Sequence, residues 1–91
     1  MGATLEGKTA LVTGSSKGIG KAISLAFAEA GADLIITARN NDLLQKTASQ
    51  IKGMGRRCIA VPGDLCSEEN LKMIHKESIA AFGGLDILVN N

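Results

Sequence analysis

Short apolar segments alternate with longer amphipathic segments along the whole chain. The apolar segments cover residues 8–13, 33–38, 57–61 and 85–89. Short apolar runs of this kind are typical of strands in a parallel sheet with both faces covered. In each of the three segments between them, apolar residues line one face of a helix. The pattern therefore predicts the order β-α-β-α-β-α-β.

The same spacing predicts the buried face and the ends of each helix. The first helix is predicted to bury Ile19, Ala22, Ile23, Ala26, Phe27 and Ala30. The second is predicted to bury Leu44, Ala48 and Ile51, and the third Leu71, Ile74 and Phe82. Asn40 and Ser67 have side chains that cap helix N-termini. The first helix is predicted to end at Gly31, the second at Gly53 and Gly55, and the third at Gly83-Gly84.

Parallel strands require long crossover connections, so this element order places the chain in the α/β class with a doubly wound parallel sheet. We expect the strand order 3-2-1-4, numbered along the chain. The first two crossovers then cover one face of the sheet and the third covers the other. Strands 1 and 4 flank the switch point, and ligands bind beside such a point at the carboxyl ends of the strands.

Composition and charge exclude several classes of function. The formal net charge is +1 and the chain has only two aromatic residues, which argues against a nucleic-acid partner. No apolar run approaches the roughly 20 residues of a membrane span. The two cysteines, Cys58 and Cys66, are not spaced as metal ligands, and no metal site is predicted. Reduced thiols suggest a cytoplasmic protein, with Cys58 as a small core residue.

Three glycines follow the first predicted strand directly. Gly14 suits a tight turn out of the strand, Gly18 removes a Cβ where a ligand approaches, and Gly20 permits close packing of helix on sheet. Free N–H groups at the start of the helix suit a pyrophosphate. This context favours a dinucleotide site over an ordinary glycine-rich turn. An ATP-type loop is excluded, because Ser15 and Ala22 occupy positions that it requires to be glycine and Ser or Thr.

The end of the second strand separates the two nicotinamide cofactors. An NAD site places an acidic residue there to accept from the ribose hydroxyls, but this chain has Ala38 followed by Arg39. An arginine holds a 2′-phosphate through charge-assisted contacts, and Lys17 adds a second positive charge. Either residue alone is commonly a solvated surface charge. Together they favour NADP over NAD.

Polar residues also follow the third and fourth predicted strands. Asp64 can accept from the adenine amine while Leu65 supplies apolar contact, or Asp64 can form a turn before the Ser67-capped helix. Asn90 and Asn91 can hydrogen-bond the cofactor, or they can tie the strand ends together. The sequence leaves open whether Asp64, Asn90 and Asn91 contact the cofactor or have these structural roles.

Three motifs resemble those of the short-chain dehydrogenase/reductase family: TGSSKGIG at 13–20, Asp64-Leu65, and LVNN at 88–91. They cover nearly the whole chain at the spacings of that family, which implies a Rossmann-type sheet. The resemblance implies pyrophosphate contacts by Gly14, Ser16, Gly18, Ile19 and Gly20. It also implies contacts with the adenosine phosphate by Lys17 and Arg39, with adenine by Asp64 and Leu65, and with the adenosine ribose by Asn90.

The resemblance is strongest to the NADP-preferring ketoreductase branch, which interconverts a ketone and a secondary alcohol. It implies that residues 1–91 are the N-terminal part of a single domain, truncated after strand 4. The family's catalytic Ser, Tyr and Lys would follow residue 91, and the chain contains no tyrosine. We therefore expect no catalytic residue in this chain, with His75 on the surface, and no activity from it alone. The full-length protein is expected to form a homo-oligomer.

Two alternatives to the enzyme remain open at this point. The chain can be a dinucleotide-binding module without turnover, such as a truncated paralogue of the enzymes. It can also be a structural remnant that binds no ligand. The coding sequence after residue 91 separates these alternatives from a reductase.

Overall fold

The computed structural model describes residues 5–63 and 68–90. Seven elements follow the predicted order: β1 (Thr9–Thr13), α1 (Gly18–Glu29), β2 (Asp33–Ala38), α2 (Asn41–Gly53), β3 (Cys58–Pro62), α3 (Glu68–Phe82) and β4 (Ile87–Val89). The predicted cap of α3, Ser67, lies outside the described residues.

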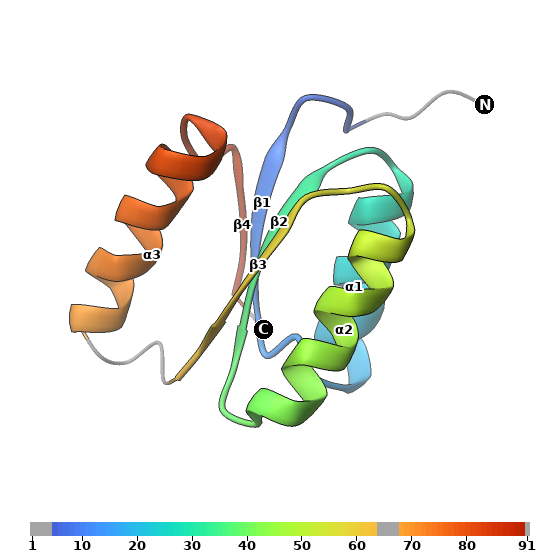
Figure 1. Cartoon of the computed structure of the whole chain (residues 1–91), viewed down its shortest axis with the longest axis horizontal. Coiled ribbons are helices and arrows are strands. Elements are labelled where there is room, and N and C mark those ends of the chain that lie inside the picture. The colour runs from blue at the N-terminus through green and yellow to red at the C-terminus, as the bar shows by residue number, and fades with distance from the viewer. Residues whose placement is uncertain (1–4, 64–67, 91) are drawn as a thin grey trace.

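The four strands form one parallel sheet in the order β3-β2-β1-β4, which confirms the predicted topology. In Figure 1, α1 and α2 cover one face of the sheet and α3 covers the other. The crossover from β3 to β4 therefore runs on the opposite face from the first two. This reversal places the switch point between β1 and β4, as expected for a doubly wound sheet.

Alternate residues of the strands divide the core between the two faces. Val12 and Ile36 belong to the cluster that packs against α1 and α2, whereas their neighbours Leu11 and Ile35 belong to the cluster under α3. This division follows from the pleat, because successive side chains of a strand point to opposite faces. The continuous apolar run of β2 is thus explained by a strand that is covered on both sides.

The N-terminus of α2 and the C-terminus of α1 have the predicted caps. The Asn40 side chain accepts a hydrogen bond from the Leu43 N–H at 3.1 Å. Gly31, which follows the C-cap residue Ala30 of α1, has a φ of +103°, and the next N–H, that of Ala32, donates to the Phe27 carbonyl at 3.0 Å. This bond is characteristic of a helix that ends with a left-handed residue, a conformation that glycine adopts readily.

The predicted buried face of α1 is wrong in part: Ile23 and Phe27 pack against the core, but Ile19, Ala22 and Ala26 are exposed. Ile19 is 70% exposed, and the fully buried residues of the helix are Gly20, Ser24 and Ala28. These three small residues lie four positions apart on one side of the helix. Small side chains let the helix axis approach the sheet closely, so the larger Ile23 and Phe27 pack only at the flanks of the contact.

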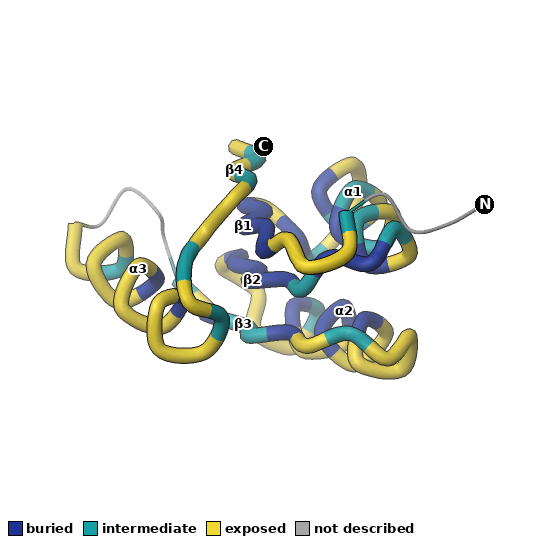
Figure 2. The backbone as a smooth tube through the Cα atoms, turned by 90° about the horizontal axis from the view of Figure 1, so that it is seen from above, coloured by how far each residue is buried: buried dark blue, intermediate teal, exposed yellow. Residues whose placement is uncertain are grey.

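The same effect corrects the inner face of α3. Ile74 is buried and Phe82 packs partly against the core, as predicted, but Leu71 is 49% exposed. The buried stripe continues through Ser78, which is fully buried four residues after Ile74. Figure 2 shows the resulting contrast between the buried strands β1 and β2 and the largely exposed α3.

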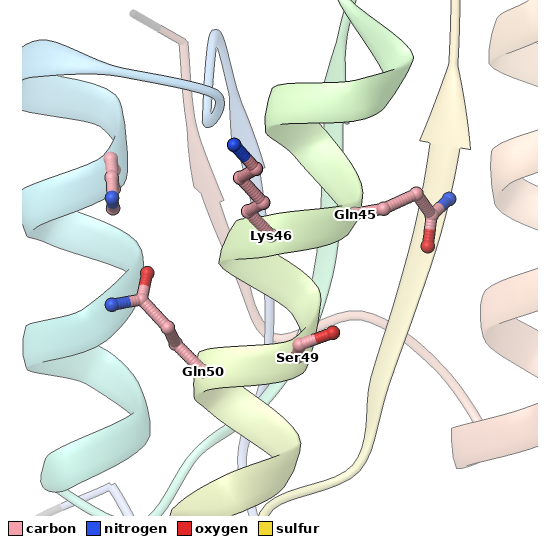
Figure 3. A pocket seen from close by; sticks show the side chains of 5 residues that line it. Gln45, Lys46, Ser49 and Gln50 are labelled. Carbon is pink, nitrogen blue, oxygen red and sulfur yellow. The ribbon is translucent and has the colours of Figure 1, made fainter.

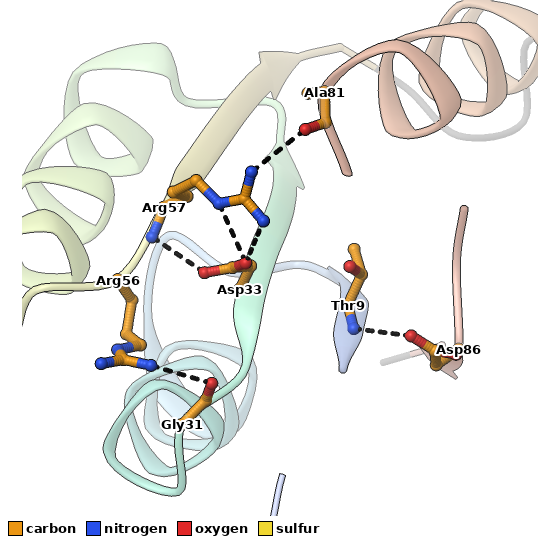
Figure 4. Close-up of polar contacts among 7 residues, drawn as sticks. All are labelled: Thr9, Gly31, Asp33, Arg56, Arg57, Ala81 and Asp86. Carbon is orange, nitrogen blue, oxygen red and sulfur yellow. Dashed lines mark hydrogen bonds and ion pairs between the residues drawn. The ribbon is translucent and has the colours of Figure 1, made fainter. Parts of the chain in front are cut away.

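Polar contacts connect the elements at the amino ends of the strands (Figure 4). Two guanidinium nitrogens of Arg57, Nε and Nη2, donate to Asp33 Oδ2 at 3.0 and 2.7 Å, and Nη1 donates to the Ala81 carbonyl at the end of α3. Asp86 accepts from the Thr9 N–H at 2.9 Å and donates its own N–H to the Thr9 carbonyl. The strand β4 begins at Ile87, directly after this contact, and is therefore shorter than the predicted strand over residues 85–89.

We expect Ile36→Val to lower the free energy of unfolding by about 0.5–1.5 kcal/mol, because it removes a methylene from a fully buried position. The matched control is Ile79→Val on α3, where the side chain is 51% exposed and a change below about 0.5 kcal/mol is expected. Urea titration followed by circular dichroism measures both. Equal losses in the two variants would contradict the assigned core.

Candidate functional site

The carboxyl ends of β1, β2 and β4 meet at one edge of the sheet. Thr13 at the end of β1 pairs in register with Thr37 of β2, and Val12 pairs with Val89 of β4. The glycine loop, which we define as residues 14–20, therefore starts between the residues that follow β2 and β4. This places the predicted site residues Arg39 and Asn90 on either side of the loop.

Two glycines of this loop have backbone conformations that other residues rarely adopt. The φ angles of Gly14 and Gly18 are +64° and +61°. A Cβ added to Gly18 would have no heavy atom within 4 Å, so the space in front of this residue is open. The positive φ thus explains Gly18 locally, and the open space leaves room for a ligand beside its backbone.

The N-terminus of α1 differs from that of α2 in its charge and capping. Lys17 stands at the cap position with extended backbone and makes no capping hydrogen bond with its side chain, and the first turn holds no acidic residue. By contrast, α2 has the Asn40 cap and Asp42 in its first turn. The first N–H groups of α1 and the positive end of its dipole are therefore not opposed by a local carboxylate, which suits an anionic ligand.

Inside the loop, the fully buried Ser15 connects four elements. Its N–H donates to the Thr37 carbonyl at 3.1 Å, and its Oγ donates to the Val12 carbonyl at 2.6 Å. The Ser24 hydroxyl lies 3.2 Å from Ser15 Oγ, and the Thr47 hydroxyl donates to the Ser15 carbonyl at 3.0 Å. The loop is thus attached to β1, β2, α1 and α2 at a single residue.

The sequence reasoning missed the role of these three hydroxyl groups. Thr47 lies beside Ala48 on the predicted buried face of α2, so a polar residue inside an apolar stripe was the available signal. Ser24 gave no such signal, because the buried face of α1 was placed on the wrong residues. Side-chain hydroxyls that are buried are generally hydrogen-bonded, but the sequence does not identify the partner.

The outer residues of the glycine loop are accessible to solvent. Lys17 and Ile19 are exposed and Ser16 is partly exposed, whereas Gly20 is buried on the inner side of α1. Ile19, in the first turn of α1, has a large apolar side chain that is 70% exposed. The exposed Arg39 follows the buried Ala38 at the end of β2.

The structure supports the tying role for Asn90. The Thr13 hydroxyl donates to Asn90 Oδ1 at 3.4 Å, which connects the carboxyl ends of β1 and β4. Asn90 is nevertheless exposed, so its amide group remains accessible at the same edge of the sheet. Asp64, Leu65 and Asn91 lie outside the described residues, and their predicted contacts stay predictions.

Two other chemically reactive groups among the described residues, Cys58 and His75, lie away from the glycine loop. Burial raises the pKa of the Cys58 thiol from 9.0 to about 12, so it is a neutral core residue at physiological pH. His75 is exposed on α3, as predicted. In residues 5–63 and 68–90 there is no cluster of potential metal ligands. Nor is any helix of this part long and apolar enough to cross a membrane.

A hollow of about 440 Å³ lies between α1 and α2 (Figure 3). It is lined by the polar side chains Lys21, Gln45, Lys46, Ser49 and Gln50. None of them belongs to the predicted site, and the four on α2 include no acidic or apolar group that would recognise a particular ligand. The candidate site is therefore the edge of the sheet around the glycine loop and not this hollow.

Comparison with known proteins connects this geometry to a family. Residues 8–91 match the family model described as short chain dehydrogenase. An uncharacterised oxidoreductase of Mycobacterium tuberculosis is 45% identical over 87 residues, which are 96% of this chain and 33% of that protein. The L-rhamnose 1-dehydrogenase (NAD(P)(+)) of a Sphingomonas species is 39% identical over 88 residues, 96% of this chain and 35% of that protein.

Solved structures show the same similarity. The L-sorbose reductase of Gluconobacter frateurii, complexed with NADPH and L-sorbose, has a TM-score of 0.90 and 40% identity, covering 100% of this chain and 35% of that chain. A hydroxysteroid dehydrogenase of Escherichia coli has a TM-score of 0.89 and 38% identity over 96% of this chain and 37% of that one. The chain spans about a third of the length of the curated relatives it matches.

We expect alkylation of Cys58 by iodoacetamide at pH 8 to be at least about a hundredfold slower in the folded protein than in urea, because the raised pKa leaves very little thiolate. Peptide mapping by mass spectrometry reads Cys58 separately from Cys66. Equal rates in the folded and unfolded protein would contradict a buried, neutral thiol.

Proposed function

Since this chain belongs to the short-chain dehydrogenase/reductase family, we propose that it is the dinucleotide-binding part of an NADP(H)-dependent oxidoreductase. The observation that carries the proposal is the start of α1, where an open glycine loop precedes a first helical turn that holds no acidic residue. The proposal concerns binding of the dinucleotide first, because the chain spans about a third of its relatives' length.

The pyrophosphate is proposed to lie over the glycine loop. Its contacts would be made by Gly14, Ser16, Gly18, Ile19 and Gly20. The positive φ and the open front of Gly18 support this placement, because a ligand can approach the backbone there without meeting a side chain. The positive end of the α1 dipole then stabilises the phosphate charge.

The preference for NADP over NAD is proposed to depend on Arg39 and Lys17. Both residues are exposed: Arg39 directly follows β2, and Lys17 is the cap residue of α1 in the loop that leaves the adjacent strand β1. No acidic residue occupies position 38 or 39 to accept from the ribose hydroxyls. Among the related proteins, the L-sorbose reductase structure holds NADPH, and the L-rhamnose dehydrogenase is named for both cofactors.

Asp64 and Leu65 are proposed to contact the adenine, and Asn90 the adenosine ribose. The proposed reaction interconverts a small ketone and a secondary alcohol, for which the bound nicotinamide supplies or accepts the hydride. This chain holds the dinucleotide and orients it through the glycine loop. It contains no tyrosine, so the proton transfer of the family's mechanism is not assigned to any of its residues.

We expect Arg39→Ala to raise the Kd for NADPH about tenfold to a hundredfold, because a charge-assisted contact to the 2′-phosphate is lost. The Kd for NADH should change less than about twofold, since NADH lacks this phosphate. Fluorescence of the reduced nicotinamide during titration measures both constants.

The control for Arg39→Ala is Lys76→Ala. This substitution removes an exposed positive charge from α3, which covers the face of the sheet opposite to α1 and α2. It should leave both constants unchanged. If Arg39→Ala raises the Kd for NADPH and the Kd for NADH by the same factor, Arg39 does not contact the 2′-phosphate.

Gly18→Ala should weaken NADPH and NADH alike, about tenfold or more, because its methyl group would occupy the space proposed for the pyrophosphate. Gly55→Ala is the matched control: Gly55 has a φ of +83° against +61° for Gly18, and a Cβ at either position has nothing within 4 Å. Both variants should lose about 1 kcal/mol of stability through backbone strain. If Gly55→Ala weakens binding as much as Gly18→Ala, the loop is not the pyrophosphate site.

A further inference from the structure

The peptide between Ser15 and Ser16 faces two environments. The Ser15 carbonyl points inward, where it accepts the hydrogen bond from Thr47 at 3.0 Å. In a trans peptide the C=O and N–H groups point in opposite directions, and the structure contains no cis peptide bonds among its described residues. The Ser16 N–H therefore points away from α2 and toward the outer side of the glycine loop.

The Ser16 N–H has no acceptor among residues 5–63 and 68–90. Ser16 itself is partly exposed, whereas Ser15 is fully buried. An outward backbone donor at this position lies one residue before the cap of α1, a helix whose first turn holds no acidic residue. A donor of this kind suits an anionic oxygen.

Thr47 is the side chain that holds this peptide in place. It lies on α2, 32 residues from Ser15, and it is fully buried. Its hydroxyl also lies 3.4 Å from the Leu43 carbonyl of its own helix, so the shorter contact is the one to the loop. The other described contacts of Ser15 hold its N–H and its hydroxyl, and only Thr47 holds its carbonyl.

We propose that Thr47 is a positioning residue for the dinucleotide, because its hydrogen bond to the Ser15 carbonyl aims the Ser16 N–H at the pyrophosphate. This proposal rests on the proposed function of the glycine loop. Thr47 itself does not touch the cofactor. Loss of its hydroxyl leaves a buried carbonyl without its partner, so the peptide turns toward water and the Ser16 N–H turns with it.

Thr47→Val tests the proposal because it removes the hydroxyl and keeps the shape of the side chain. The Kd for NADPH and for NADH should rise by the same factor, about tenfold, since the pyrophosphate is common to both. Thr47→Ser retains the hydroxyl, so the Kd for NADPH and the Kd for NADH should both stay within about twofold of the wild-type values.

Ser78→Ala is the matched control for a merely structural role. Ser78 is also fully buried on a helix, but its hydroxyl donates to the His75 carbonyl three residues earlier in α3 and touches no part of the loop. It should lower the thermal unfolding temperature without changing either Kd. If Thr47→Val lowers that temperature and leaves both constants unchanged, the positioning role is overturned.

Amide hydrogen exchange separates this proposal from the proposed function. The Ser15 N–H is bonded to the Thr37 carbonyl, so release of the loop by Thr47→Val should speed its exchange about tenfold, but Thr47→Ser and Ser78→Ala should not. Wild-type protein that binds neither NADPH nor NADH overturns the proposed function and, with it, the role toward the dinucleotide. Unchanged exchange of the Ser15 amide in Thr47→Val overturns the attachment of the loop by Thr47 in either case.

Discussion

The position of β1 between β2 and β4 is the constraint on which the other features of this fold depend. Parallel strands can be joined only across a face of the sheet, and the third crossover runs on the face opposite to the first two. The connections that follow β1 and β2 therefore run on one face of the sheet, and the connection that leads into β4 runs on the other. The glycine loop begins at the carboxyl end of β1, beside this switch point, where doubly wound sheets bind their ligands.

Close approach of α1 to the sheet is the second condition for this loop. The buried stripe of Gly20, Ser24 and Ala28 presents little volume to the sheet, so α1 lies near the residue that leads into it. Ser15 then contacts β1, β2, α1 and α2 through its own backbone and hydroxyl. A loop rich in glycine would be free to move without such contacts, because glycine restricts the backbone so little.

Several parts of the candidate site were predictable from local sequence. Gly18 was identified from its place after a strand, and the structure explains it by a positive φ and open space. Thr47 was not identified, because its partner is 32 residues away and hydrogen-bond pairing at that separation depends on how the helices pack. For Asn90 the sequence left two roles open, and the contact with Thr13 supports the tying role.

By itself, the sequence determined the order of the elements, the parallel sheet and the family. These properties follow from hydrophobic periodicity and from motifs at fixed spacing, which are local or nearly local. Only the tertiary structure decided which faces of α1 and α3 are buried. Ile19 and Leu71 have the right periodicity but are exposed, because close packing on the sheet selects the small residues Ser24 and Ser78 instead. Burial depends on the volume available between elements, and no single segment of sequence contains that information.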